Sequence, residues 1–189
     1  MNTDALILHY DFSNVSSTIV PDLTGCGMAG VIRGVDRGGA RLSRESVFGQ
    51  DCPVLTLSGG SQGGYLQLPD GILNTSEGFT ISFYGKLSQL DTYGTICSFG
   101  ADHCFYLSVL PDPEDSSCFL LSFGATKGGR SQETALEHWP RLSFGTWFHV
   151  ILTMDASPQS LITLYLDGKK AGEARHRRMT AADMNGCRD

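Results

Sequence analysis

The sequence predicts an all-β fold, a two-sheet antiparallel sandwich, and three observations support this. Short apolar runs with period-two alternation recur from end to end. Glycine accounts for 23 of 189 residues, above the usual ~7%, and glycine pairs separate many of these runs. Only one segment has a helical composition. Many short strands with spaced turn signals and almost no helix are typical of sandwiches and barrels.

The expected strands are short and end at Gly, Pro, Asn or Asp residues. The clearest lie at 6–12, 53–57, 65–69, 79–87, 95–100, 104–111, 118–124, 146–155 and 160–168. Segment 131–139 is expected to form a turn or two of helix. A chain of 189 residues is within the size of one domain, so residues 1–189 are expected to form a single domain.

Alternation assigns faces to these strands. Within 79–87, Phe79, Ile81 and Phe83 share one face, and the polar side chains share the other. The runs 104–111 and 147–154 divide in the same way. The apolar faces should pack against a second sheet, whereas the opposite face is either plain surface or a shallow binding surface.

The candidate ligand-binding residues lie on this polar face or in a connection. Flat aromatic rings can stack on sugars or anchor protein partners, while packing within the fold is the alternative role for each residue. The candidates are Ser82, Tyr84, Tyr106, Trp139 and His149.

The charge balance argues against nucleic acid as a partner. The net charge is −6 and the pI is about 5.3, whereas nucleic-acid binding needs clustered Lys and Arg. The one basic run, 175–178, is expected to be a solvated loop. No signal-peptide pattern opens the chain, and no apolar run approaches the ~20 residues that cross a bilayer, so no membrane partner is expected.

The six cysteines lie far apart, without a Cys-x-x-Cys pair or zinc-ligand spacing. Three of them fall in or beside apolar strand-like runs, where a free thiol behaves as a small hydrophobe. Mostly reduced, buried cysteines are therefore expected, which favours a cytosolic or anaerobic origin. The even count also permits disulfides, and the compartment is left open.

The sequence predicts no enzyme activity. A glycanase needs two carboxylates flanking the scissile bond, but the glutamates fall in loops or strand flanks. The Gly-x-Ser-x-Gly match at 59–63 lies between two expected strands, whereas a nucleophile elbow joins a strand to a helix. Asp102, His103 and Cys104 are consecutive strand residues, so their side chains point to opposite faces and do not converge on a metal.

Four segments resemble the laminin-G-like jelly rolls of the concanavalin-A-like lectin/glucanase superfamily, especially bacterial modules found beside glycoside hydrolases. They occur in the family's order over nearly the whole chain. Two departures are Tyr84, where the family has Trp, and Cys26 and Met28, where the opening loop often has Asn. The segments are LILHYDF with PDLTGCGMAGVIRG (6–12 and 21–34), GFTISFYGKL (78–87), FGTWFHVILTMD (144–155) and LITLYLDGKKAGEA (161–174).

The resemblance implies a jelly roll that acts as a non-catalytic carbohydrate-binding module, accessory to a glycoside hydrolase, with a polysaccharide or oligosaccharide as ligand. The alternative is a structural or protein-interaction domain that docks on a neighbouring domain of the same chain, and a glycan hydrolase ranks third. The resemblance also implies a structural calcium ion at Asp22. Asp22 as a side-chain cap of the following turn is the competing interpretation.

The family's closing strand has no counterpart here, because the chain stops at MNGCRD. The sequence is therefore expected to be the N-terminal module of a longer protein. Without that closing strand, the first strand at 6–12 would be an exposed edge through which the chain could self-associate.

Overall fold

A computed structural model describes residues 6–60, 63–73, 78–90, 92–100, 105–125, 139–156 and 160–175, and the backbone of 134–135. These residues form antiparallel strands, turns and loops without any helix, which confirms the all-β prediction. Consequently this part of the chain offers no helical membrane span. The chain forms two compact units, Met1–Ile72 and Leu73–Asp189, and each is described by itself. The single domain over 1–189 stays a prediction.

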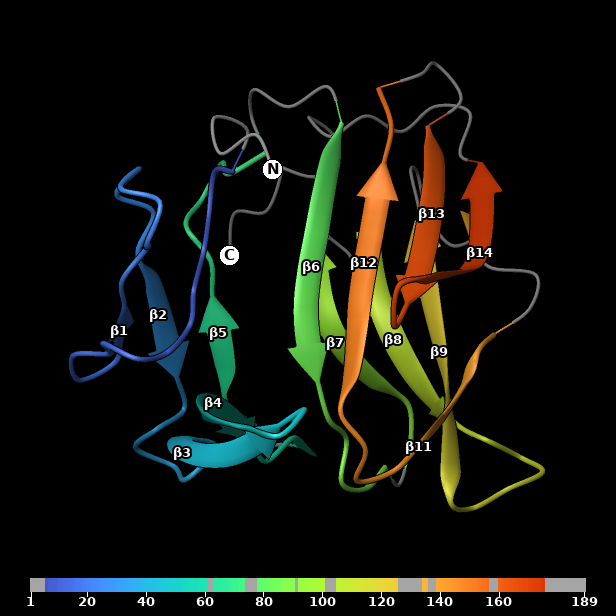
Figure 1. Cartoon of the computed structure of the whole chain (residues 1–189), viewed down its shortest axis with the longest axis horizontal. Coiled ribbons are helices and arrows are strands. Elements are labelled where there is room, and N and C mark those ends of the chain that lie inside the picture. Colours follow the sequence, from blue (N-terminus) through green and yellow to red (C-terminus); the bar gives the residue numbers. More distant parts are fainter. Residues whose placement is uncertain are drawn as a thin grey trace. The chain divides into compact units, whose positions relative to one another are not determined.

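The second unit is a sandwich of two antiparallel sheets (Figure 1). The front sheet has the order β14-β13-β12-β6, and the back sheet has the order β10-β9-β8-β7, with β11 also pairing with β9. The front strands are β6 (Phe79–Gly85), β12 (Phe148–Met154), β13 (Leu161–Leu166) and β14 (Lys169–Arg175). The back strands are β7 (Gly94–Phe99), β8 (Phe105–Pro111), β9 (Cys118–Ala125), β10 (Thr134–Ala135) and β11 (Arg141–Ser143).

The core of this sandwich lies between the apolar faces that alternation predicts. The rings of Phe79 and Phe105 meet edge to face at 5.6 Å, and those of Phe119 and Phe148 lie 5.9 Å apart. Both contacts join the front sheet to the back sheet. Fully burying one such side chain stabilises a fold by ~1.5–3 kcal/mol. The largest fully buried apolar side chains of this unit are Phe105, Leu107, Phe119, Leu121, Phe123, Val150, Leu152, Ile162 and Leu164.

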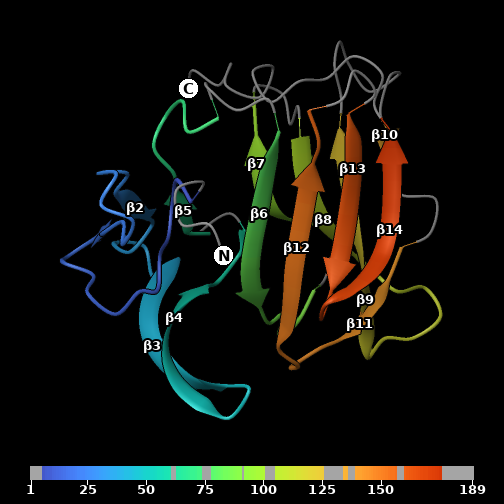
Figure 2. The same ribbon diagram turned by 45° about the horizontal axis from the view of Figure 1, so that its top comes forward.

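The first unit contains a three-stranded sheet of order β1-β2-β5 and a separate two-stranded β3-β4 sheet, the curved hairpin seen in Figure 2. Val20, Ile32 and Ala40 form its buried centre. Half-buried side chains, including Tyr10 and Leu66, pack around them. The strands are β1 (Ile19–Val20), β2 (Gly30–Arg33), β3 (Ala40–Val47), β4 (Gln50–Leu57) and β5 (Tyr65–Gln67).

Glycine lets two backbone segments of this unit approach closely. The Gly39 carbonyl accepts hydrogen bonds from the Ser58 and Gly64 amides, both at 3.0 Å. A Cβ atom on Gly64 would lie 2.5 Å from the Ala40 Cβ and 2.7 Å from the Arg33 carbonyl oxygen, so no larger residue fits. The described part of the glycine-rich segment 59–64 thus connects β4 to β5, as the sequence indicates, although Ser61 lies outside the described residues.

Segment 6–12 forms no strand, so this expectation is wrong. Phe12 has a φ of 60°, which interrupts an extended backbone. His9 instead donates its backbone N–H to Asp22 Oδ1 at 3.1 Å and accepts a hydrogen bond from Leu23 N at 3.0 Å. Because 6–12 is not a strand, it offers no strand edge for the expected self-association.

Two further expectations fall partly or wholly on residues that are not described. Within 131–139, Thr134–Ala135 form strand β10 rather than helix, while 131–133 and 136–138 lie outside the described residues. Residues 176–189 also lie outside them, so the expected lack of a closing strand and the solvated loop expected for the basic run beyond Arg175 remain predictions.

The alternation can be tested by comparing a core residue with an exposed one. Phe105→Ala should lower the free energy of unfolding by about 3–5 kcal/mol, because it leaves a cavity among the packed rings. Thr80→Ala removes an exposed side chain of β6 and should change it by less than about 0.5 kcal/mol. Urea unfolding measures both values, and similar losses would contradict the proposed core.

Candidate functional site

Three of the predicted site residues lie together on the outer face of the front sheet. In the β6–β12 pairing His149 lies opposite Tyr84, and Ser82 lies opposite Ile151. The Tyr84 and His149 rings stack with centroids 4.4 Å apart and an interplanar angle of 23°. His149 Nε2 lies 2.8 Å from Ser82 Oγ. Tyr84 is 57% exposed, so the stacked pair presents an aromatic surface to solvent.

The backbone of His149 is fixed by the turn between β13 and β14. This two-residue turn, Asp167–Gly168, has φ values of 48° and 77°, as a type I′ hairpin requires, and Asp-Gly is a preferred pair for it. Asp167 Oδ1 accepts a hydrogen bond from His149 N at 2.8 Å. Asp167 N donates to the His149 carbonyl at 3.0 Å. One turn residue therefore binds both backbone groups of His149.

A second aromatic contact lies just beyond the paired ends of β6 and β12. Phe148, the first residue of β12, lies opposite Gly85, the last residue of β6. Trp147 precedes Phe148 and Lys86 follows Gly85, so these two residues lie just outside the last pair. The Lys86 Nζ atom lies 5.3 Å from the centroid of the Trp147 ring, a cation–π contact. We call Tyr84, His149, Trp147 and Lys86 the aromatic platform.

A row of threonines crosses the same outer face. Thr153 lies opposite Thr80 on one side and opposite Thr163 on the other. Alternation places them on the same side as Ser82 and His149. Thr163 is only 6% exposed, so the face combines aromatic rings at one end of the strands with the hydroxyl groups of Thr80 and Thr153 further along.

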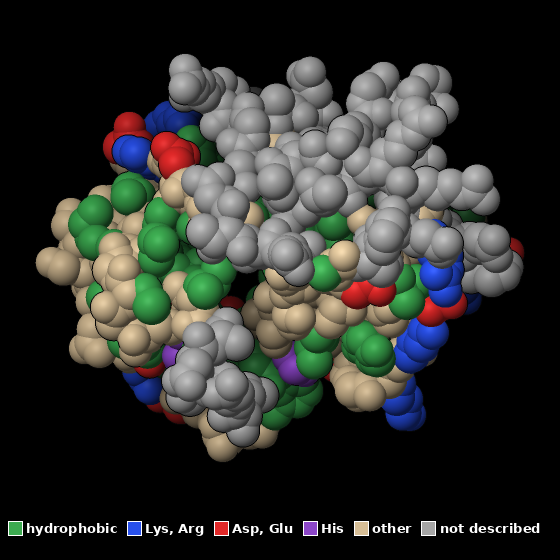
Figure 3. All heavy atoms as spheres, turned by 90° about the horizontal axis from the view of Figure 1, so that it is seen from above, with side chains coloured by type: hydrophobic (Ala, Val, Ile, Leu, Met, Phe, Trp, Pro, Cys, Tyr) green, Lys and Arg blue, Asp and Glu red, His purple; other side chains and the backbone are tan. Residues whose placement is uncertain are grey.

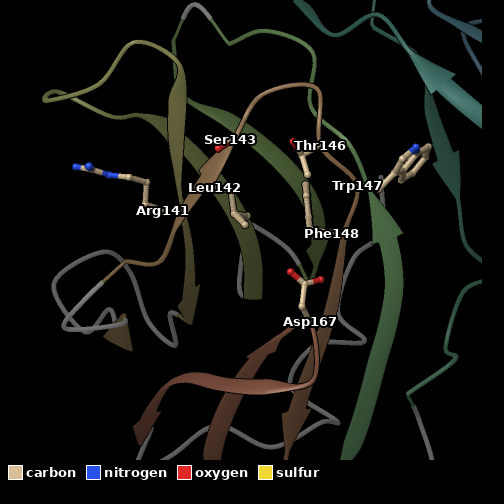
Figure 4. A pocket seen from close by; sticks show the side chains of 7 residues that line it. All are labelled: Arg141, Leu142, Ser143, Thr146, Trp147, Phe148 and Asp167. Carbon is tan, nitrogen blue, oxygen red and sulfur yellow. The ribbon is translucent and has the colours of Figure 1, made fainter. Parts of the chain in front are cut away.

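A pocket of about 220 Å³ adjoins this end of the sandwich (Figure 4). It lies between β11, the connection from β11 to β12, and the β13–β14 turn. The Asp167 carboxylate lies among Leu142, Thr146 and Phe148, whereas the Trp147 ring and the Arg141 side chain point away from them. The guanidinium of Arg141 is ion-paired with the buried Asp112 and, at 2.9 Å, with Glu114.

Comparison with known proteins identifies the family. A sequence model described as "Concanavalin A-like lectin/glucanases superfamily" matches residues 59–185. The chain belongs to this superfamily. Among curated proteins, none matches the sequence significantly.

Solved structures of low sequence identity share the fold of this chain. The binding domain of botulinum neurotoxin serotype C1 has a TM-score of 0.57 and 16% identity, covering 97% of this chain and 41% of that chain. The binding domain of botulinum neurotoxin DC in complex with SialylT has a TM-score of 0.55 and 15% identity, covering 94% and 41%. The same domain in complex with rat synaptotagmin II has a TM-score of 0.52 and 15% identity, covering 98% and 42%. The chain thus spans about two fifths of their length, and the likeness shows the fold.

Hydrogen bonds connect three of the segments whose sequences resemble the superfamily. Ser82 belongs to the segment 78–87, His149 to 144–155 and Asp167 to 161–174, and hydrogen bonds connect all three. Three segments that resemble the superfamily therefore meet at one point. Sequence analysis missed Asp167 and Trp147 as site residues, although the Asp-Gly pair after an apolar strand is a recognisable hairpin signal.

Of the two other predicted residues, Tyr106 belongs to the back sheet and Trp139 lies just before β11. Tyr106 lies on β8 between Phe105 and Leu107, both fully buried in the core, so it faces outward on the opposite side of the sandwich. Trp139, 42% exposed, precedes Pro140, whose carbonyl accepts a hydrogen bond from Leu121 N of β9 at 3.0 Å. The five residues predicted for ligand binding therefore do not form one site.

Asp22 caps its turn. Oδ1 accepts hydrogen bonds from the amides of His9 and Thr24, and Oδ2 accepts from the Thr24 hydroxyl and the Met28 amide. The Thr24 hydroxyl is the main cause that lowers the pKa of Asp22 to about 2. Within the described residues no group of three His, Cys, Asp or Glu side chains could hold a metal. These donors do not fit a calcium ion at Asp22, since the ion would have to displace them.

The described cysteines are free thiols, namely Cys26, Cys52, Cys97 and Cys118. Cys118 is buried and Cys26 is exposed. Burial raises the pKa of the Cys97 thiol to about 11, which keeps it protonated and unreactive at neutral pH. Residues 101–104, including Cys104, and Cys187 lie outside the described residues.

Asp167 should be more important for stability as a hydrogen-bond acceptor than as a charge. Asp167→Ala removes the acceptor for His149 N and should lower the free energy of unfolding by about 1 kcal/mol. Asp167→Asn keeps an acceptor oxygen and a residue that tolerates positive φ, so it should unfold like the unaltered protein. Chemical unfolding compares the two variants, and an equal loss in both would contradict this role.

Asp22 should make stability depend on pH under acidic conditions. Because its pKa falls from 3.8 to about 2 on folding, its charged form stabilises the fold above pH about 4, and this contribution disappears as the pH falls toward about 2. The stability difference between the unaltered protein and Asp22→Asn should shrink over that interval. Urea midpoints measured at several pH values test this, and a constant difference would argue against it.

Proposed function

We propose that the chain is a non-catalytic glycan-binding module, accessory to a glycoside hydrolase, and that the aromatic platform is its binding surface. The observation that carries this proposal is the exposed Tyr84 ring, which is held in place by stacking on His149. An aromatic ring offers a flat apolar face to the C–H side of a sugar and excludes water from it.

The platform is preorganised for binding. Asp167 binds the backbone of His149, and Ser82 is hydrogen-bonded to its ring. The ring on which Tyr84 stacks is therefore fixed in position. A rigid aromatic surface loses little conformational entropy when a ligand binds. The exposed Thr80 and the half-buried Thr153 supply hydroxyl groups along the same face, as hydrogen-bond donors and acceptors for sugar hydroxyls.

The comparisons support carbohydrate binding in a general way. The superfamily description names lectins and glucanases, and one structurally similar neurotoxin binding domain is in complex with SialylT. This architecture hosts several functions, so the platform of this chain is the more specific support. Accessory action beside a glycoside hydrolase rests on the resemblance of the sequence to such modules.

The absence of catalysis is part of the proposal. Ser82 and His149 lie at the distance of a nucleophile and its base, but Asp167 binds the backbone of His149 rather than its ring. A working nucleophile–base pair normally has a third group that orients the base. Glu173 is hydrogen-bonded to Lys170 at 2.6 Å, which lowers its pKa, whereas a glycosidase acid needs a raised pKa.

A docking role is the second candidate, and the exposed apolar side chains of the first unit favour it. Figure 3 shows hydrophobic side chains gathered on the surface of this unit. The exposed apolar residues of the unit include Ile19, Leu23 and Val35, each 44–45% exposed. Exposed apolar patches mark interaction surfaces when they are contiguous and large. Such a domain would pack on a neighbouring domain of the same chain without binding sugar.

A glycan array probed with and without calcium tests the proposed function. Saturable binding is expected, and Tyr84→Ala or Trp147→Ala should weaken it about tenfold or more, equivalent to about 1.4 kcal/mol. Trp139→Ala is the matched control, because this exposed aromatic residue lies in the connection that leads into β11 of the back sheet. Loss of binding in Trp139→Ala alone would contradict the platform and indicate a site beside the back sheet. If the folded, unaltered protein bound no glycan, the docking role would be favoured.

A further inference from the structure

We infer that the pocket beside the β13–β14 turn is a chain-end subsite, which takes the neutral terminal sugar residue of a glycan lying on the aromatic platform. This inference rests on the proposed function and adds to it the part of the glycan that is recognised. A module of this kind binds chain ends and short oligosaccharides in preference to the interior of long polysaccharides.

The pocket and the platform share Trp147 and are also linked through Asp167. Trp147 is one of the residues that line the pocket. Its ring points away from the Asp167 carboxylate and makes the cation–π contact with Lys86 on the platform. Asp167 lines the pocket and binds the backbone of His149, whose ring supports Tyr84. A ligand stacked on the platform therefore meets the pocket at the same end of the front sheet.

The lining of the pocket has the chemistry of a site for a polyhydroxyl group. Asp167 uses Oδ1 for the His149 amide, and Oδ2 has no hydrogen bond among the described residues. A carboxylate oxygen is a strong acceptor for sugar hydroxyls. Ser143 and Thr146 add hydroxyl groups, while Leu142 and Phe148 supply apolar surface for the C–H groups of a ring.

The charge of the pocket selects a neutral sugar. Arg141 is the other ionised residue of the lining, but its guanidinium is bound to Asp112 and Glu114 and points away from the Asp167 carboxylate (Figure 4). Within the pocket lining, Asp167 is therefore the charge that faces the terminal sugar, whereas Lys86 belongs to the platform. A uronic or sialic acid carboxylate placed beside it would be repelled, because like charges at short range disfavour each other.

The size of the pocket limits the ligand to about one ring. Its volume of about 220 Å³ is below the ~300–1,000 Å³ of pockets that enclose drug-sized ligands. An oligosaccharide does not fit inside it, whereas one terminal residue does, with the rest of the chain on the platform.

The Asp167→Asn variant distinguishes an effect on ligand binding from an effect on folding. The Asn carbonyl oxygen can still accept the His149 N–H bond and Asn tolerates the positive φ of the turn, but the ligand-facing oxygen is replaced by an NH2 donor. The probes are neutral hexasaccharides (cello-, xylo-, laminari-, manno- and maltohexaose), each paired with its parent polysaccharide at equal sugar mass. Titration calorimetry measures binding, and thermal melting confirms that each variant is folded.

The inference predicts that at least one hexasaccharide binds more tightly than its parent polysaccharide, that its monosaccharide competes, and that Asp167→Asn weakens it tenfold or more. Thr146→Val, which removes another pocket hydroxyl without touching the turn, should weaken the same ligand. Unchanged binding in both variants, with binding lost in Tyr84→Ala, would overturn the chain-end subsite and leave the proposed function intact. Failure of unaltered protein to bind any hexasaccharide or polysaccharide would overturn both.

Discussion

The carboxylate and amide of Asp167 hold the backbone of His149, and the arrangement of the candidate site depends on this contact. The Asp167–Gly168 turn has to adopt positive φ at both residues to close the β13–β14 hairpin. This conformation brings Asp167 Oδ1 to His149 N and Asp167 N to the His149 carbonyl. Since β12 is a central strand of the front sheet, the turn fixes its start relative to β13.

The consequences extend from this contact to the surface. With its backbone held, the His149 side chain binds Ser82 across the β6–β12 ladder and stacks on Tyr84. The core on the other side of β12, with Val150 and Leu152 buried, prevents the strand from slipping by one residue, which would exchange its two faces. Hydrophobic packing inside and hydrogen bonding outside therefore specify the same register, and a rigid aromatic surface is the result. The first unit uses a similar device, because the Asp22 carboxylate binds three backbone amides.

Much of the second unit could be predicted from sequence because its strands have one buried and one exposed face. In β6 and β12 the alternation identifies the inward-facing side chains, with Phe79 and Phe83 half-buried and Val150 fully buried. It places Ser82, Tyr84 and His149 on the outer face. The strands that escaped prediction, such as β3 and β14, have mixed charged and small residues with little apolar alternation. Segment 6–12 has the alternation of a strand but bonds to Asp22 and Leu23 instead, a long-range contact that local pattern does not contain. Tyr106 was grouped with Tyr84 because alternation gives the face of each strand, not the sheet to which the strand belongs, and Trp139 was added only as an aromatic residue in a connection.

The central claim is that ligands bind the outer face of the front sheet at the end where β6, β12 and the β13–β14 turn meet. The most direct measurement is the perturbation of backbone amide chemical shifts while a bound oligosaccharide is titrated into isotope-labelled protein. If ligands bind there, the perturbed amides should cluster at 82–86, 146–149 and 165–168. Perturbations concentrated on β7, β8 and β9, around Tyr106 and Trp139, would contradict it and assign the site to the back sheet.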